Sequence, residues 1–182
     1  MARTLHVDPF DEDLVWWRSV RVGIDVDERT DPASEGRWQR LLVVDALYLS
    51  SNAETVMAEW HNFLEQYGRP KVGAGVAERD LYSMTVDFSE EIADLSTEEK
   101  LDAVRLEVPV PGRATWPAYQ AVGEQLFRDG WGGLVAPSAP YPGGLTLCLF
   151  IDPRTPFGLA RLSGPDRQRV LPPRPPGMRP PP

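Results

Sequence analysis

Segments with the periodicity of strands and segments with the periodicity of helices follow one another along most of this chain. The strand-like segments, in which apolar residues alternate with polar ones or run together, are 14–24, 46–49, 81–88, 134–136 and 145–151. The helix-like segments are 51–67, 97–105 and 116–128. A chain of 182 residues buries one hydrophobic core more readily than two. The sequence therefore predicts a single α+β domain with a mixed β-sheet core and flanking helices.

The composition changes near residue 160. From Arg161 onward the chain holds five Arg, one Asp and many Pro, and it ends in Pro180-Pro181-Pro182. Such a segment has too few apolar side chains to offset the entropy lost on folding. We therefore expect a globular domain over residues 1–160 and a disordered Pro/Arg-rich tail over residues 161–182.

The helix predicted after residue 50 carries one carboxylate in an unusual place. Ser51 and Glu54 fit a capping box that opens this helix, and Gly68 with Pro70 supplies its end. The predicted apolar stripe consists of Val56, Trp60, Phe63, Leu64 and Tyr67. Glu54 and Glu65 fall opposite this stripe, whereas Glu59 lies roughly 80° from its centre. A carboxylate at the margin of a core needs a partner.

Charge and residue counts exclude several classes of function. The formal net charge is -8, so the field of the protein repels a phosphate backbone and we expect no direct binding of nucleic acid. No signal-peptide pattern and no apolar run of ~20 residues is present, which predicts a cytoplasmic protein that does not cross a membrane. The lone Cys148 is expected to be a buried thiol. The only histidines, His6 and His61, lie in no metal-ligand spacing, so we predict no metal.

Short motifs in a fixed order resemble the RES domain family. The motifs are Trp17-Arg18, Gly36-Arg37-Trp38, Tyr48-Leu49-Ser50, Ala58-Glu59, Trp131-Gly132-Gly133-Leu134 and Pro137-Ser138-Ala139. The match runs from about residue 15 to residue 151. The resemblance implies a fold like that of ADP-ribosyltransferases, in which NAD lies as substrate in a cleft lined by Arg, Tyr, Glu and Ser.

The resemblance also implies a role for each residue, and chemistry explains why these types are suitable. Arg18 and Arg37 would bind the NAD phosphates, because a guanidinium donates two parallel hydrogen bonds and keeps its charge. Glu59 would anchor the ribose and stabilise positive charge that develops when nicotinamide leaves. Tyr48 would stack on nicotinamide, and Ser138 would hold its amide or a phosphate. Without the resemblance, surface ion pairs, core packing and a turn explain the same residues.

Three functions remain open from the sequence. The first is an NAD-consuming enzyme that cleaves the nicotinamide–ribose bond by hydrolysis or phosphorolysis, with Glu59 and Arg37 as catalytic residues. In the family such a protein is the toxin of a toxin–antitoxin pair, and its partner is an antitoxin with a DNA-binding domain. The second is a mono-ADP-ribosyltransferase that modifies a protein. The third is a non-catalytic RES-fold interaction module, since Gln39-Arg40-Leu41-Leu42 departs from the Asn and the turn common in the family.

Overall fold

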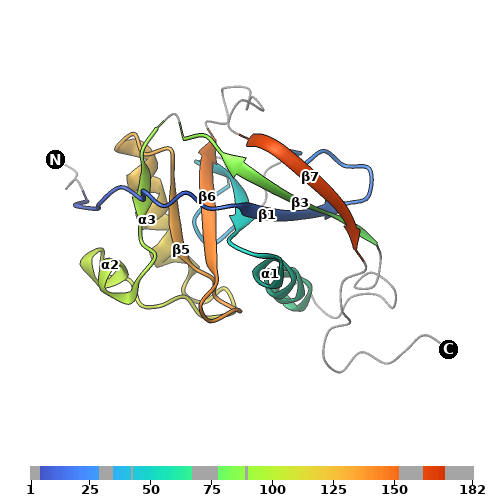
Figure 1. Cartoon of the computed structure of the whole chain (residues 1–182). Coiled ribbons are helices and arrows are strands. Elements are labelled where there is room, and N and C mark those ends of the chain that lie inside the picture. The colour runs from blue at the N-terminus through green and yellow to red at the C-terminus, as the bar shows by residue number, and fades with distance from the viewer. Residues whose placement is uncertain are drawn as a thin grey trace.

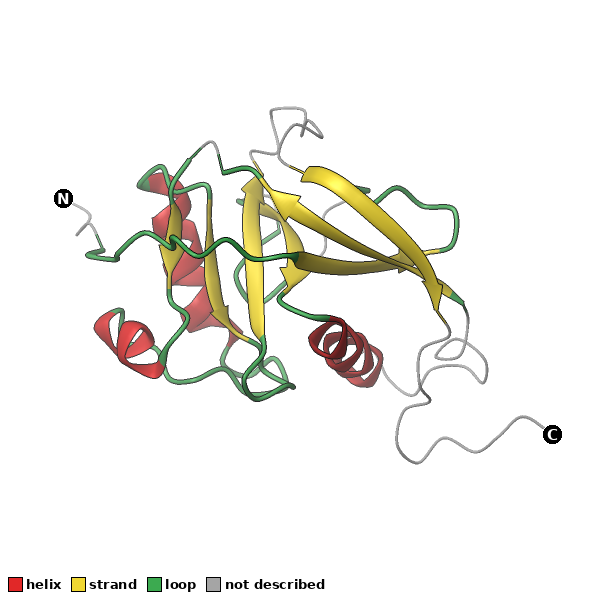
Figure 2. Cartoon of the chain, in the orientation of Figure 1, coloured by secondary structure: helices red, strands yellow, loops and turns green. Residues whose placement is uncertain are grey.

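The computed structural model describes residues 5–28, 35–41, 43–66, 78–88, 90–151 and 162–170. The described residues form the strands β1 (Trp16–Arg21), β2 (Asp45–Ser50), β3 (Arg79–Val86), β4 (Ile92–Asp94), β5 (Gly133–Pro137), β6 (Leu145–Ile151) and β7 (Leu162–Val170). They also form the helices α1 (Ala53–Gln66), α2 (Glu98–Ala103) and α3 (Trp116–Arg128). Figure 1 shows these elements in chain order, and Figure 2 separates helices from strands by colour. The predicted α+β class is confirmed.

All described strands belong to one seven-stranded sheet with the order β4-β5-β6-β2-β1-β3-β7. Neighbouring strands are antiparallel except β4 and β5, which are parallel. A parallel pair needs a crossover connection, and the chain between β4 and β5 contains both α2 and α3. These two helices lie beside the β4–β5 end of the sheet in Figure 1, whereas α1 lies near β1.

The strands of the β4–β2 half supply side chains to two hydrophobic clusters, one on each face. In β6, Cys148 and Phe150 belong to the cluster that includes Leu126 of α3, whereas Leu147 and Leu149 belong to the cluster that includes Trp16. Adjacent residues of a strand point to opposite faces, so a strand buried on both faces is a continuous apolar run. This explains why the segment Leu145–Ile151 is apolar apart from Thr146.

The helices α2 and α3 begin and end where local sequence signals place them. The side chain of Thr97 accepts a hydrogen bond from the Lys100 backbone N–H and caps α2. Helix α3 has the predicted bounds, with a Pro in its first turn. It is followed by Gly130 at a φ of 89°, a left-handed conformation that favours glycine. Both predicted helices are confirmed.

Helix α1 starts differently from the prediction. Asn52 is its capping residue, because Asn52 Oδ1 accepts hydrogen bonds from the Thr55 N–H and the Thr55 hydroxyl, both at 2.8 Å. The Ser51 hydroxyl instead accepts the Leu145 N–H at 2.9 Å. The predicted Ser51 capping box is therefore wrong, since Ser and Asn are both good caps and the contact with β6 takes the serine. The predicted end at Gly68 and Pro70 lies outside the described residues.

The apolar stripe predicted for α1 is only partly buried. Val56 and Leu64 are buried, and Trp60 is half-buried. Phe63 is 46% exposed, so its place in the stripe was wrong. Tyr67 lies outside the described residues. The helix covers the sheet with a narrower face than the periodicity predicts, which leaves room beside it.

Residues 162–170, expected to be disordered as part of the tail, form the edge strand β7. It pairs with β3 from Arg79↔Val170 to Val86↔Leu162, with an irregularity between Ser83 and Thr85. Nearly all of its side chains are exposed, so the strand is held by backbone hydrogen bonds that leave no hydrophobic pattern. The Arg169 Nε–H donates to the buried carboxylate of Asp80 at 3.2 Å. Residues 171–182 of the predicted tail lie outside the described residues.

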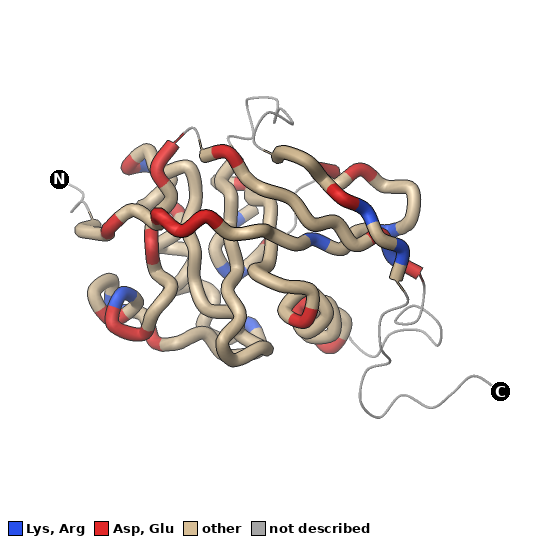
Figure 3. The backbone as a smooth tube through the Cα atoms, viewed as in Figure 1, with Lys and Arg blue, Asp and Glu red and all other residues tan. Residues whose placement is uncertain are grey.

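Charged residues occur in most of the described strands and helices. Figure 3 shows acidic residues along most of the described chain, with basic residues of β7 close together at one end of that strand. Of the described helices, none combines the length and the apolar character that crossing a membrane requires.

Candidate functional site

A pocket of about 480 Å³ opens where β1 and β2 separate. Within the described residues these strands pair only at Trp17 and Ser50, whereas β1 pairs with β3 over its whole length. The walls of the pocket come from β1, β2, α1 and the segment 35–39. The volume lies in the range of small-molecule sites. The separation of two neighbouring strands therefore creates the cavity.

Four of the five predicted site residues line this pocket, and the fifth supports it. Arg18, Arg37, Tyr48 and Glu59 line the wall. Ser138 is 5% exposed and lies behind Glu59, while Pro137 and Ala139 on either side of it reach the pocket. Residues that are far apart in the sequence thus meet around one cavity.

Glu59 is held at the wall by several hydrogen bonds. The Ser138 hydroxyl donates to Glu59 Oε1 at 2.7 Å. The Thr146 side chain and the Ala139 backbone also hydrogen-bond to this carboxylate. Burial raises the pKa of Glu59, while these hydrogen bonds and the charge of Arg37 oppose the rise. The result is a partly desolvated carboxylate in a fixed orientation.

Ser138 owes its position to the turn between β5 and β6. Its backbone N–H donates to the Gly144 carbonyl oxygen at 2.8 Å. A Cβ at Gly144 would lie 2.2 Å from Thr55 Oγ1 of α1, so a glycine is required for this close approach. The turn and α1 are packed together, and this packing brings Ser138 to Glu59. Its hydroxyl orients the carboxylate.

Arg37 is anchored in the pocket wall by groups from the segment before α3. One terminal nitrogen donates to the Val110 carbonyl oxygen at 2.7 Å, and the other donates to Thr115 Oγ1 at 3.5 Å. The guanidinium carbon lies 5.0 Å from the centre of the Tyr119 ring. Burial lowers the pKa of Arg37, and Tyr119 and Glu59 oppose this shift. The guanidinium therefore stays charged and ordered.

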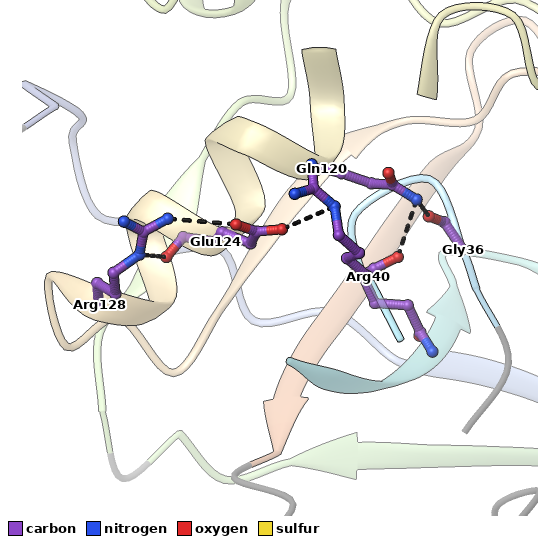
Figure 4. A network of polar contacts seen from close by, with 6 residues as sticks. Gly36, Arg40, Gln120, Glu124 and Arg128 are labelled. Carbon is purple, nitrogen blue, oxygen red and sulfur yellow. Dashed lines mark hydrogen bonds and ion pairs between the residues drawn. The ribbon is translucent and has the colours of Figure 1, made fainter. Parts of the chain in front are cut away.

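Helix α3 fixes the backbone that carries Arg37. The Gln120 side-chain amide donates to the carbonyl oxygens of Gly36 at 3.0 Å and Gln39 at 3.2 Å. Arg40 Nε forms an ion pair with Glu124 at 3.0 Å, and Arg128 binds the other oxygen of Glu124 at 3.2 Å. Figure 4 shows this network between α3 and the Gly36–Arg40 segment. Of the residues that depart from the family pattern, Gln39 and Arg40 thus have defined partners here.

Arg18 enters the pocket where the pairing of β1 and β2 ends. Its Nη2–H donates to the Glu28 carbonyl oxygen at 2.9 Å, whereas its buried Nη1 has no hydrogen-bond partner among the described residues. Burial lowers the pKa of Arg18 to about 10, with Asp27 opposing and Arg79 reinforcing the shift. A buried donor without an acceptor is costly, and an anionic ligand would satisfy it.

Tyr48 has a structural bond that the sequence did not indicate. Its hydroxyl accepts the Trp38 N–H at 3.1 Å and lies against Gly36, where a Cβ would come within 2.6 Å of it. Burial raises the pKa of Tyr48, and a hydrogen bond with the neighbouring Cys148 adds to the rise. Cys148 is the buried thiol that the sequence predicts. Tyr48 therefore both lines the pocket and holds the segment that bears Arg37.

Sequence reasoning missed several residues of the pocket. Arg79 and Trp60 are the most notable, because the Arg79 guanidinium carbon lies 3.8 Å from the centre of the Trp60 ring. Trp60 was assigned to the apolar stripe of α1, and Arg79 precedes the predicted strand without any motif. Thr146 was hidden in the apolar run of β6. Arg79 lies opposite Arg21 of β1, a pairing that local sequence patterns do not indicate.

The pocket is lined by four cations and by the acidic residues Glu28, Glu35, Asp45 and Glu59. The cations are Arg18, Arg21, Arg37 and Arg79, and the indoles of Trp17, Trp60 and Trp116 add flat apolar surface. Among the described residues, no group of three or more His, Cys, Asp or Glu could hold a metal ion. The arginines and indoles are suited to an anionic, partly aromatic molecule.

Comparison with known proteins agrees with the fold and with the motifs. The family model of the RES domain matches residues 11–169, a span that includes β7. The fold is similar to a chain in the crystal structure of the M. tuberculosis MbcT–MbcA toxin–antitoxin complex, with a TM-score of 0.70 and 22% sequence identity. That similarity covers 90% of this chain and 87% of the other. No curated protein matches the sequence.

Proposed function

The chain belongs to the RES domain family, and from this membership we propose that it is an enzyme that consumes NAD by cleaving the nicotinamide–ribose bond. The observation that carries the proposal is the environment of the Glu59 carboxylate. Its carboxylate is partly desolvated, is held by Ser138 at 2.7 Å and shares a pocket with Arg37. A sugar bound beside a fixed carboxylate is the arrangement that glycosidic cleavage requires.

The proposed reaction places positive charge next to Glu59. The bond from ribose C1′ to the nicotinamide nitrogen breaks, and both electrons leave with the ring, which becomes neutral nicotinamide. Positive charge then develops on the ribose, and a preorganised carboxylate stabilises it without reorganisation. An oxygen of water or of inorganic phosphate then forms a bond to C1′, and its proton is released. The products are ADP-ribose or its 1-phosphate, together with nicotinamide.

The arginines would hold the diphosphate while this bond breaks. Arg18 has an unsatisfied donor, and Arg37 is already fixed by Val110 and Thr115. Guanidinium groups fixed before binding lose little entropy when they meet phosphate oxygens. Tyr48 would offer its ring to the nicotinamide end of the pocket. Ser138 would act through Glu59, because its hydroxyl is already donated to that carboxylate.

We further propose that the protein is the toxin of a toxin–antitoxin pair. Family membership supports this role, as does the similarity in fold to a chain of the MbcT–MbcA complex. Loss of NAD would harm the cell that makes the protein, so the enzyme would need an inhibitor. The proposed partner is an antitoxin with a DNA-binding domain, and both would act in the cytoplasm, where NAD is available.

The enzymatic proposal is tested by following NAD with the purified chain, in buffers with and without inorganic phosphate. Glu59→Gln should lower the rate on the order of a hundredfold or more, because one preorganised electrostatic group is worth ~3 kcal/mol. Glu65→Gln is the matched control, since Glu65 is an exposed glutamate of the same helix. The products separate hydrolysis from phosphorolysis, and labelled NAD reveals transfer to protein. Stable NAD under every condition would refute the proposal.

The biological role is tested by expression in cells. Induction of the chain should lower cellular NAD and stop growth, whereas Glu59→Gln should do neither at equal protein level. Co-expression with the protein encoded beside it should restore growth if that protein is the antitoxin. Normal growth with active enzyme present would contradict the role as a toxin.

A further inference from the structure

Two arginines stand directly opposite each other on β1 and β3 beside the pocket. Arg21 and Arg79 are cross-strand partners, and both line the pocket wall. Like charges at directly opposed positions of an antiparallel pair destabilise it. A sheet that keeps such a pair needs a compensating interaction, and an anion between the two guanidinium groups would provide one.

Arg79 is held in one orientation without a carboxylate. Its Nε–H donates to the Ser19 hydroxyl at 2.6 Å, and its Nη2–H donates to the Ser19 carbonyl oxygen at 3.1 Å. The guanidinium lies over the Trp60 ring at 3.8 Å, and the residue is 9% exposed. Ser19, Arg21 and Arg79 lie on the same face of the sheet, because Ser19 and Arg21 are two residues apart. The charge is therefore fixed in advance of any ligand.

No carboxylate of the described residues forms an ion pair with Arg21 or Arg79. Asp80 directly follows Arg79, but its carboxylate accepts the Gly23 N–H and the Arg169 side chain. The pKa of Arg79 is lowered to about 10, mainly by burial and to a smaller extent by the charge of Arg21. In a chain with a net charge of -8, two neighbouring cations that form no ion pair within the described residues are unusual.

The place of these arginines in the pocket suits a phosphate group. The part of α1 that lines the pocket extends from Val56 to Gln66, which is about 15 Å of helix. Glu59 lies in the first half of this stretch, and Trp60 is the next residue. The Trp60 indole N–H, buried in the same wall, also has no acceptor in the described part of the chain. Unsatisfied donors and a cation pair therefore border the same part of the cavity.

We propose that Arg21 and Arg79, the latter positioned by Ser19 and Trp60, form a second phosphate-binding subsite of the pocket, separate from Arg37. This inference rests on the proposed function, since the phosphate belongs to the reaction. Two sources share the chemistry: the diphosphate of the bound dinucleotide, and a free inorganic phosphate that would attack C1′. The subsite selects substrates with a phosphate at this position.

Direct binding separates the two sources without any need for turnover. ADP-ribose and inorganic phosphate are titrated calorimetrically into the full chain and into Arg79→Gln and Arg21→Gln. Each variant loses a charge-assisted hydrogen bond to phosphate, so its affinity for the ligand that occupies the subsite should fall about tenfold or more. Weaker ADP-ribose binding assigns the diphosphate, and weaker phosphate binding alone assigns free phosphate. Unchanged affinity in both variants, or no binding of either ligand to the unaltered chain, overturns the subsite.

Controls distinguish a lost phosphate contact from a lost fold. Arg21→Gln removes an exposed side chain, so it tests the subsite even if Arg79→Gln is unstable. Arg113→Gln is the matched control, because Arg113 also lies over a tryptophan, 4.8 Å from the Trp116 ring centre, but does not line the pocket. Arg79→Lys keeps the charge and should recover part of the lost affinity. Recovery by Lys is not expected if Arg79 only supports packing.

Kinetics separate failure of the subsite from failure of the proposed function. With NAD as substrate in phosphate-free buffer, Arg79→Gln should raise KM about tenfold and change kcat little if the diphosphate is the ligand. With free phosphate as the ligand, the KM for phosphate should rise instead. If neither the unaltered chain nor any variant consumes NAD, but the variants still bind ADP-ribose or phosphate more weakly, the subsite stands and the enzymatic proposal fails. If the variants consume NAD with unaltered KM values and unaltered affinities, the enzymatic proposal stands and the subsite fails.

Discussion

The hydroxyl of Ser138 donates a hydrogen bond of 2.7 Å to the Glu59 carboxylate, although 79 residues separate the two in the chain. The bond joins the end of β5 to the middle of α1 beside the pocket. It satisfies one oxygen of a carboxylate that burial would otherwise penalise. The same bond opposes protonation, so it adjusts both the orientation and the charge of Glu59.

The first prediction concerns the pH dependence of the proposed activity. Burial raises the pKa of Glu59 and the Ser138 hydrogen bond lowers it, so Ser138→Ala should raise this pKa further. If the carboxylate form is active, the acidic limb of kcat/KM against pH moves to higher pH in Ser138→Ala. Ser163→Ala, on the exposed strand β7, should leave the limb in place. A limb that stays or moves to lower pH contradicts this role of Ser138.

The second prediction concerns the segment that carries Arg37. Gln120→Ala removes the donors to the Gly36 and Gln39 carbonyl oxygens. Denaturant titration should show a loss of about 1–2 kcal/mol in unfolding free energy. Kinetics should show a higher KM for NAD, because Arg37 is less well fixed. Gln125→Ala, which loses only a surface bond to Asp129, should have little effect on either quantity. An unchanged KM in Gln120→Ala would show that Arg37 is fixed by other contacts.

The third prediction concerns stability and pH at the β3–β7 edge. The Gly23 N–H, aided by Arg169 and opposed by burial, holds the pKa of Asp80 below its usual range. A depressed carboxyl pKa stabilises the fold above the unfolded value of about 3.9, and that gain disappears as pH falls through the folded pKa. Asp80→Asn should therefore lower Tm at pH 7, and the difference from the unaltered chain should shrink toward pH 3. A constant difference would exclude ionisation as the cause.

The fourth prediction concerns close packing of α3 on the segment before β2. A Cβ at Gly123 would lie 2.3 Å from the Trp38 carbonyl oxygen. Alanine normally stabilises a helix relative to glycine by about 1 kcal/mol. Here Gly123→Ala should instead destabilise the fold by about 1–3 kcal/mol, because backbone must move. Ala121→Gly, at an exposed position of the same helix, is the control and should show the usual loss of stability when glycine replaces alanine. A more stable Gly123→Ala would mean that α3 can shift away from Trp38.

Local sequence signals predicted elements whose ends depend on neighbouring residues. Thr97 caps α2 through its own side chain, and Gly130 ends α3 through its backbone conformation, so both helices were found correctly. Strand β7 was missed because its pairing with β3 uses backbone groups, which leave no pattern of apolar side chains. Ser51 was misassigned because a distant residue, Leu145, competes for its hydroxyl. Interactions over long separations are not visible in local patterns.

The candidate site shows the same division. Glu59 was singled out by its angle on a helix, and its need for a partner was expected from its partly buried position. Its partner Ser138 could not be derived from spacing, since only the tertiary fold brings β5 to α1. The meeting of Arg18, Arg37 and Glu59 came from family resemblance. Arg79 has no motif, and its position follows only from the register of β1 with β3.

The single pair between β1 and β2 makes the sheet weakest at its centre. Strands β4, β5, β6 and β2 form one continuous ladder, and β1, β3 and β7 form another, with Trp17 and Ser50 as their only paired junction in the described part of the chain. Few backbone hydrogen bonds couple the two ladders, so the cluster that Trp16 and Met84 share with Leu149 is the main contact that opening of one ladder must break. We expect hydrogen exchange to show two cooperative units, with amides of β3 and β7 exchanging together and earlier than those of β6.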